Sequence, residues 1–133
     1  MGVKMSKNLT TAKTFVDAVD CINAEGASTL APHAIADAPF SCQADMLKEV
    51  TTISAYGEWS KTFLAGNQTA IFEGILAEDK ASNTVIWNGL VWPGGKEGPV
   101  LEYAYILHFS ADGKVDSMKK IWNDKFSMAA LGM

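Results

Sequence analysis

Residues 100–122 constrain the fold of this chain most strongly, because they contain two strand patterns joined by a short turn. From Leu101 to Phe109 the large apolar residues occupy the odd positions, an alternation typical of a strand with one buried face. The sequence Ser-Ala-Asp-Gly at 110–113 then provides a turn, since glycine tolerates positive φ and aspartate can bond its own backbone. The alternation is less regular in 115–122, which predicts a β-bulge or a strong twist. We therefore predict a β-hairpin whose bulky rings point inward.

Upstream of this hairpin, helical spacing gives way to strand spacing. Apolar residues recur at helical intervals in 9–22, which predicts a long first helix that stops by Gly26. A short second helix is predicted at 28–36 and a third at 43–65, with a break near 56–57. A brief extended piece is predicted near 38–40, and strands are predicted at 68–77, 83–92, 100–109 and 115–123.

The composition fits a single domain that spans residues 1–133. The chain has 133 residues, of which 48% are hydrophobic and 20% are charged, so it can bury a sizeable core. No apolar run is long enough for a signal peptide or a membrane span, and a cytoplasmic location is expected. The glycine-rich segment 93–99 does not open a helix, so it is not expected to bind phosphate, and no cofactor is expected.

The charge balance narrows the range of partners. The net charge is −4, and all 11 basic residues are lysines. Without arginine the chain lacks the planar guanidinium fork that often holds carboxylates and phosphates, so lysine is the only basic side chain for that purpose. The lysines are scattered apart from Lys119 and Lys120, whereas nucleic-acid binding usually needs clustered positive charge. We therefore expect a small, neutral or mostly apolar ligand and no nucleic acid.

The last third of the chain resembles a known family signature. The run YILHFSADGKVDSMKKIWND, followed by FSMAALGM, resembles the end of proteins of the nuclear transport factor 2-like superfamily, particularly its SnoaL-like polyketide-cyclase and ketosteroid-isomerase-like branches. The predicted order of helices and strands upstream is similar as well. This resemblance implies an α+β fold in which a cone-shaped, curled antiparallel sheet wraps round about three N-terminal helices and encloses an apolar pocket. It also implies a homodimer.

The resemblance implies where acid–base chemistry would lie. Tyr105 falls on the inward face of the penultimate strand, where the ketosteroid-isomerase-like branch has an acidic hydrogen-bond donor, and a buried phenol can stabilise an oxyanion. The general base of that branch falls near Cys42, with Asp45 as the nearest carboxylate. Ala18 stands near the position of a tyrosine in the same branch, so steroid isomerisation itself is not expected. His33 is a second candidate for moving a proton, and its alternative is a solvated or packing histidine.

Large side chains supply the expected pocket wall. Met118 and Trp122 match apolar pocket positions of the same branch. Trp87, Tyr103 and Tyr56 are further candidates, and for each aromatic residue the alternative is a place in an ordinary core. No metal site is expected, because the histidines and carboxylates do not form the usual set of three or four ligands.

Two functions of different classes follow from these residues. The first is a cofactor-independent isomerisation, cyclisation or dehydration of a small molecule, in which Tyr105 polarises a carbonyl and Asp45 or His33 acts as the base. The second is a non-catalytic module for ligand binding or dimerisation. A carboxylate or imidazole beside the Tyr105 hydroxyl would favour the enzyme, and a wholly apolar cavity would favour the binding module.

Overall fold

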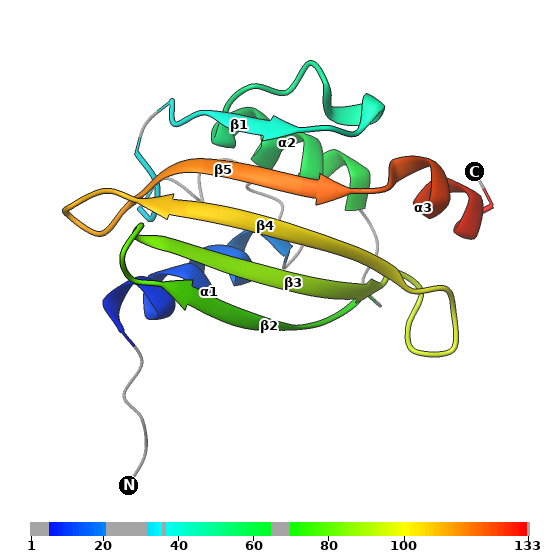
Figure 1. Cartoon of the computed structure of the whole chain (residues 1–133). Helices are drawn as coiled ribbons and strands as arrows, with labels where there is room; N and C mark the ends of the chain where they lie inside the picture. The colour runs from blue at the N-terminus through cyan, green and yellow to red at the C-terminus, as the bar shows by residue number, and fades with distance from the viewer. Residues whose placement is uncertain (1–5, 21–31, 36, 65–69, 133) are drawn as a thin grey trace, which may run out of the picture.

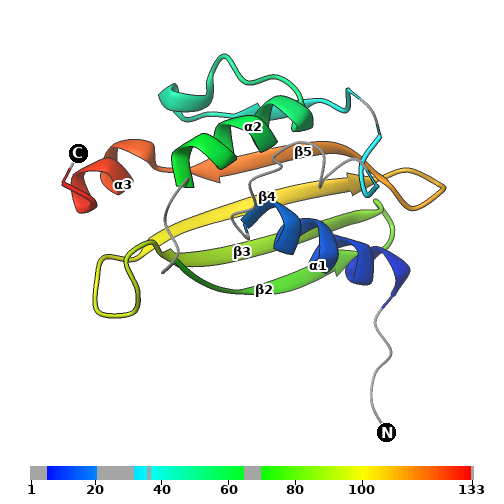
Figure 2. The same cartoon turned by 180° about the vertical axis from the view of Figure 1, so that it is seen from behind.

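The chain forms one five-stranded sheet with helices packed on one of its faces (Figures 1 and 2). This arrangement is seen in a computed structural model of the chain, which describes residues 6–20, 32–35, 37–64 and 70–132. The elements are α1 (Lys7–Asp20), β1 (Phe40–Cys42), the 3-10 helix η2 (Asp45–Leu47), α2 (Ile53–Leu64), β2 (Ile71–Asp79), β3 (Thr84–Trp92), β4 (Leu101–Phe109), β5 (Val115–Trp122) and α3 (Asp124–Ala130). The predicted α+β fold is confirmed.

The sheet has the strand order β1-β5-β4-β3-β2 and is open, with β1 and β2 at its two edges (Figure 1). The strands β2 to β5 pair antiparallel with their neighbours in sequence, and β1 alone pairs parallel, with β5. These strands match the four predicted strands and the predicted extended piece, with ends that differ by a few residues.

The two faces of the sheet have different surroundings. We call the face covered by α1 and α2 the inner face; these helices lie in front of the sheet in Figure 2. The odd positions of β4, which the sequence predicts to be buried, are at most 6% exposed there. The opposite, outer face is uncovered in Figure 1 and exposes large apolar side chains. By strand register, the exposed isoleucines of the outer face are Ile75, Ile86 and Ile121.

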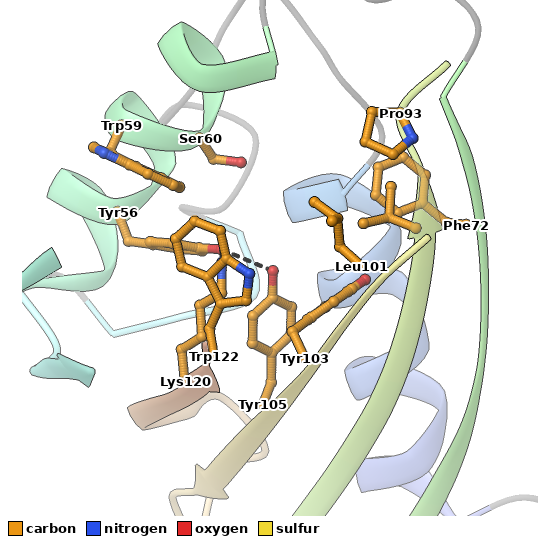
Figure 3. Close-up of a pocket in the computed structure, with 11 residues that line it drawn as sticks. Tyr56, Trp59, Ser60, Phe72, Pro93, Leu101, Tyr103, Tyr105, Lys120 and Trp122 are labelled. Atoms are coloured by element: carbon orange, nitrogen blue, oxygen red, sulfur yellow. Dashed lines mark hydrogen bonds between the residues drawn. The ribbon is translucent and has the colours of Figure 1, made fainter. Parts of the chain in front are cut away.

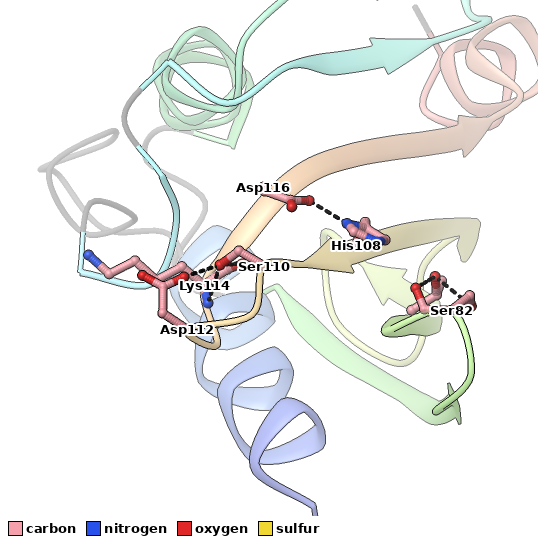
Figure 4. A network of polar contacts seen from close by, with 7 residues as sticks. Ser82, His108, Ser110, Asp112, Lys114 and Asp116 are labelled. Atoms are coloured by element: carbon pink, nitrogen blue, oxygen red, sulfur yellow. Dashed lines mark hydrogen bonds and ion pairs between the residues drawn. The ribbon is translucent and has the colours of Figure 1, made fainter.

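A β-bulge in the β4–β5 hairpin decides which residues of β5 point inward. The register shifts between His108 and Phe109, and Asp116 is the extra residue. On the outer face, the Asp116 carboxylate lies 2.5 Å from His108 Nδ1 (Figure 4). The predicted irregularity is therefore confirmed. The residues of β5 that it leaves buried on the inner face are Val115, Met118, Lys120 and Trp122.

The segment before α2 differs from the helix predicted at 43–65. It forms the short helix η2, then an extended stretch, and then α2, which continues without a break through 56–57. The extended stretch pairs with the start of β1, since the N–H of Phe40 donates to the carbonyl of Thr51 at 2.9 Å. Thr52 Oγ1 then accepts a backbone N–H of the first turn of α2 at 3.1 Å, which fixes where α2 begins. The predicted break at 56–57 is wrong, because backbone pairing ahead of Ile53 interrupts the helix instead.

Part of the predicted helical region lies outside the described residues. The predicted helix at 28–36 lies mostly there, and Ala34, which is described, forms a parallel bridge with Val115. The predicted first helix at 9–22 corresponds to α1. None of the helices in the described part of the chain combines the length and the apolar character needed to cross a membrane.

The helix α3 follows β5 directly and was not predicted. Asn123 caps it, because its side-chain oxygen accepts the N–H of Phe126 at 3.0 Å. The buried carboxylate of Asp124 accepts the N–H of Met46 at 3.0 Å, which ties the start of α3 to η2. Together these bonds hold α3 at the end of the sheet where β5 finishes (Figure 1).

Candidate functional site

A small cavity lies between α2 and the inner face of β4 and β5 (Figure 3). Its volume is about 40 Å³. A single buried water needs roughly 10–15 Å³ measured in this way, so the cavity in this shape holds a few heavy atoms. Its lining residues are Tyr56, Trp59 and Ser60 of α2, Phe72 of β2, Val91 of β3, Pro93, Leu101, Tyr103 and Tyr105 of β4, and Lys120 and Trp122 of β5.

Lys120 stands at the deep end of this cavity. The β-bulge turns it inward, and only 6% of the residue is exposed. Its Nζ donates a hydrogen bond to Tyr56 Oη at 2.9 Å. Tyr56 Oη in turn lies 2.8 Å from Tyr105 Oη, and either phenol can donate in that second bond (Figure 3). A buried polar chain therefore connects β5, α2 and β4.

Aromatic rings surround the Lys120 ammonium group. Its Nζ lies 4.3 Å from the ring centroid of Trp122. Four further ring centroids lie between 5.0 and 5.9 Å from Nζ. They belong to Tyr56, Trp59, Tyr103 and Tyr105. A cation within about 6 Å of a ring face is attracted to it, so these rings favour the charged form of Lys120 in a place with little water.

The hydrogen-bond balance of this chain is fixed by chemistry. An ammonium group only donates, so Tyr56 Oη must accept from Lys120. Each phenol has one hydrogen, and the Tyr56–Tyr105 bond uses one of the two in either direction. One phenolic O–H and two ammonium N–H groups therefore donate outside these two bonds. The deep end of the cavity is rich in donors and carries positive charge.

Ring packing holds Tyr56 in place. Its ring stacks on Phe40 with centroids 4.5 Å apart and an interplanar angle of 11°. On its other neighbour along α2, Trp59, the centroids are 5.8 Å apart at 18°. Trp59 then meets Trp122 edge to face at 5.8 Å and 69°. These contacts orient the Tyr56 hydroxyl towards Lys120 before any ligand arrives.

Two glycines make room for the rings beneath the cavity. Gly74 of β2 and Gly89 of β3 lie opposite each other in the sheet. A Cβ atom on Gly89 would overlap Trp87 Nε1 and stand 2.5 Å from Tyr103 Cζ, and one on Gly74 would stand 2.6 Å from Trp87 Cζ2. Trp87 Nε1 donates to Tyr103 Oη at 3.2 Å. The glycine pair thus lets both rings lie close against the sheet.

The structure brings together some of the residues that the sequence nominates. Tyr105, Tyr56, Tyr103 and Trp122 all line the cavity. Trp87 and Met118 are buried, at 6% and 2% exposure, in the core beside the cavity and outside its lining.

The two predicted bases lie elsewhere. The Asp45 side chain is 72% exposed and lies 3.7 Å from Lys125 Nζ at the α3 end of the sheet. His33 is half-buried, and its backbone carbonyl accepts the N–H of Val115 at 2.9 Å. Neither is among the residues that line the cavity. Their catalytic roles remain predictions.

Lys120 is the functional candidate that sequence reasoning missed. The signal was present, because Lys120 lies between Met118 and Trp122 and so shares their face of the strand. Within the described part of the chain, no carboxylate and no imidazole lines the cavity, yet the lining is not wholly apolar. The site therefore matches neither of the two outcomes set out from the sequence. Its polar groups are an amine and phenols.

Comparison with known proteins places the fold. No family model matches the chain, and no curated protein matches it. Among solved structures, BvnE pinacolase from Penicillium brevicompactum has a TM-score of 0.71 at 11% identity, covering 98% of this chain and 97% of that one. A putative SnoaL-like polyketide cyclase from Jannaschia sp. CCS1 has a TM-score of 0.68 at 12% identity, covering 97% and 96%. An NTF2-like protein of unknown function from Burkholderia pseudomallei has a TM-score of 0.67 at 9% identity, covering 97% and 100%.

These structural neighbours define the class of fold: the chain has the α+β cone fold of the nuclear transport factor 2-like superfamily, which other neighbours name the cystatin-like fold. SnoaL-like proteins stand among those neighbours, as the C-terminal sequence signature suggests. The resemblance is thus confirmed at the level of the fold. A pocket-based function fits both this fold and the buried aromatic cluster.

Proposed function

We propose that this protein binds a small, mostly apolar molecule in the aromatic-lined cavity and polarises an oxygen atom of that molecule through Tyr105. The observation that carries the proposal is the buried chain from Lys120 through Tyr56 to Tyr105, with bonds of 2.9 and 2.8 Å. Donors that are fixed in advance in a site with little water stabilise negative charge as it develops on an oxygen. The ring packing around Tyr56 supplies that fixed geometry.

The chemistry we propose is cofactor-independent acid–base catalysis of the isomerase, cyclase or dehydratase type. Such reactions at a carbon next to a carbonyl develop negative charge on the carbonyl oxygen, which the phenolic and ammonium donors would meet. Structural neighbours named as a pinacolase, a putative isomerase and a putative polyketide cyclase share the fold, which supports chemistry in this cavity. The reaction also needs a base, and Asp45 and His33 are the candidates from the sequence.

A second candidate function is non-catalytic ligand binding by the same cavity. It is favoured by one observation, namely that the described lining residues include no carboxylate and no imidazole. In that case the donors at Lys120 and Tyr105 would hold an oxygen of the ligand without moving a proton.

Proton exchange into a small ketone separates the two candidates. Butanone or cyclohexanone would be incubated with the protein in D₂O, and loss of the α-hydrogens followed by NMR. The enzyme proposal predicts exchange faster than in buffer, and Tyr105→Phe should slow it by about tenfold or more, as expected for loss of one oxyanion donor. Tyr103→Phe is the matched control, because Tyr103 also lines the cavity but accepts its hydrogen bond from Trp87.

The possible results distinguish the candidates. Binding of the ketone with exchange at the buffer rate would favour the binding module. Neither binding nor exchange, for these ketones and for wider panels of small molecules, would overturn both. Equal loss of exchange in the Tyr103→Phe and Tyr105→Phe variants would count against a specific role for Tyr105.

We also propose that a second copy of the chain covers the outer face and forms a homodimer. The outer face exposes Ile75, Ile86 and Ile121 to 69%, 43% and 44%, and Phe126 of α3 is 64% exposed beside it. A groove of about 560 Å³ runs between α3 and this face. Light scattering should give a dimer for the wild-type protein and a monomer for Ile86→Lys, and a monomeric wild type at working concentrations would contradict the proposal. A cytoplasmic location remains a prediction from the sequence.

A further inference from the structure

We propose that Lys120 makes the cavity selective for ligands that carry an ionised oxygen, either a carboxylate or an acidic enol or phenol, on a flat apolar body. This inference rests on the proposed function, because it concerns the same cavity. It refines the mostly apolar ligand expected from the sequence by assigning that ligand one negative oxygen and a partner residue for it.

The first step is the charge of the lining. Among the described residues that line the cavity, Lys120 is the one with a charged side chain. The other lining side chains are aromatic, aliphatic or hydroxyl-bearing. An anion that enters therefore meets a positive centre without a carboxylate of the described lining beside it, in a site where few waters weaken the attraction. A neutral ligand of the same shape gains none of this attraction.

The second step is the supply of donors. Beyond the two bonds of the Lys120–Tyr56–Tyr105 chain, the three residues have two ammonium N–H groups and one phenolic O–H. An ionised oxygen accepts several hydrogen bonds at once, and bonds to a charged partner are shorter and stronger than those between neutral groups. Since the chain contains no arginine, a lysine point charge is its only basic side chain for holding an anion.

The third step is the depth of the site. Tyr56, Tyr105 and Lys120 are only 1%, 2% and 6% exposed, so the polar groups lie at the bottom. Trp59 and Phe72 are half-buried, which marks the mouth. Figure 3 shows the aromatic side chains of α2 and β5 on one side of the space, with Phe72, Leu101 and Pro93 across from them. A ligand placed here has its ionised oxygen inside and its apolar part between rings, which favour flat, unsaturated groups.

The fourth step is the size of the bottom of the site. A volume of about 40 Å³ accommodates a carboxylate or a single ring oxygen with its carbon. The rest of the ligand must occupy the mouth, beside Trp59 and Trp122. Binding should therefore change the fluorescence of these tryptophans, which gives a direct readout without knowledge of the natural ligand.

The test compares benzoate with benzamide, its neutral counterpart of similar shape, by tryptophan fluorescence and calorimetry. Wild-type protein should bind benzoate about tenfold or more tightly than benzamide, as expected for one hydrogen-bonded charge. Lys120→Met should bring the ratio close to one. Lys119→Met is the matched control: it removes the same charge from the neighbouring, exposed residue of β5 and should leave the ratio unchanged.

A second pair of measurements identifies the source of the ionised oxygen. A nitrophenol that ionises near neutral pH is titrated above and below its own pKa. Preference for its ionised form without preference for benzoate assigns an enol or phenol, and preference for benzoate assigns a carboxylate. Should Lys120→Met fail to fold by circular dichroism, Lys120→Gln provides the uncharged variant, and the loss of wild-type preference at high salt provides a third measure.

Two results would overturn this inference and leave the proposed function standing: equal affinity of wild-type protein for ionised and neutral probes, or an unchanged ratio in Lys120→Met. Failure of every probe and every small ketone to bind would instead remove the proposed function itself. The two failures are therefore distinguishable.

Discussion

Lys119 and Lys120 are neighbours in β5, yet they occupy opposite environments. Lys120 points to the inner face, is 6% exposed and lies among five aromatic rings. Lys119 is exposed on the outer face, opposite Ile106 of β4. The side chains are chemically the same, so strand alternation and the β-bulge alone decide that one is a candidate site residue and the other is a surface charge. Function in this fold is carried by a face of the sheet.

The same contrast extends across the sheet. On the inner face, large side chains of β3 to β5 are packed between the strands and the helices α1 and α2. On the outer face, several isoleucines are about half exposed. Substitutions on the inner face should therefore lower stability far more than equivalent substitutions on the outer face, unless a partner covers the latter. The predictions below test this difference, from the largest expected effect to the smallest.

The largest effect is expected from truncation of a core leucine. Leu107 of β4 is fully buried, so Leu107→Ala should lower the free energy of unfolding by about 3 kcal/mol through lost burial and the cavity left behind. Ile86 on the outer face is 43% exposed, and Ile86→Ala should lower it by less than about 1 kcal/mol. Urea unfolding of both variants measures the difference. Equal losses at low protein concentration would show that the two faces are not distinct in the monomer.

The next effect concerns the close approach of rings to the sheet. Gly89→Ala should lower the free energy of unfolding by about 2 kcal/mol, because the new Cβ would overlap Trp87 and Tyr103. Gly94, in the loop after β3, has open space where a Cβ would lie, with no atom within 4 Å, so Gly94→Ala should change the free energy of unfolding by no more than about 0.5 kcal/mol. Thermal and urea melts of the two variants provide the comparison. A neutral Gly89→Ala would mean that the rings do not lie against the sheet.

A smaller difference is expected between polar contacts on the two faces. Tyr56→Phe removes the acceptor of the buried Lys120 hydrogen bond and should lower the free energy of unfolding by about 1.5 kcal/mol. Asp116→Asn weakens the contact with His108 on the outer face, where the His108 side chain is 47% exposed, and should lower it by about 0.5 kcal/mol or less. Chemical denaturation at neutral pH compares them. The reverse order would contradict the buried position of the Lys120–Tyr56 bond.

The smallest effect is expected at the exposed β4–β5 turn (Figure 4). The Ser110 hydroxyl donates to the Asp112 carboxylate, and this bond, followed by the Asp112 backbone N–H, lowers the pKa of Asp112. Because the folded pKa is below the unfolded one, the ionised group adds stability above the unfolded pKa and loses it as the pH falls through the folded pKa. Asp112→Asn should therefore lower the melting temperature slightly at neutral pH, and this difference should vanish in acid. Melts over a pH series check this, and a difference that persists in strong acid would assign it to another cause.

The sequence predicts the inner face well, because the alternation in Leu101–Phe109 repeats over a whole strand. The hairpin, its irregularity and the inward direction of Tyr105 all follow from that pattern. The position of α2 does not follow, since the pairing of Thr51 with Phe40 joins residues whose contact no local pattern reveals. The 43–65 stretch has helical spacing, and the sheet edge overrides it at its start.

The site was only partly predictable for a related reason. The aromatic lining residues of β4 and β5 could be found from strand alternation, but their meeting with Tyr56 depends on how α2 crosses the sheet. Lys120 was within reach of the same alternation and was overlooked because lysines are normally exposed. Its burial is explained only when five rings from two strands and one helix are seen around it.

The most direct test of this account is the reactivity of the two neighbouring lysines. The folded protein would be treated briefly with acetic anhydride, and modification at Lys119 and Lys120 compared by fragmentation mass spectrometry, before and after unfolding in urea. We predict that Lys119 reacts in the folded protein about as readily as the exposed Lys125, that Lys120 stays unmodified, and that the two become equal on unfolding. Equal modification of Lys119 and Lys120 in the folded protein would contradict a buried lysine at the centre of the aromatic cavity.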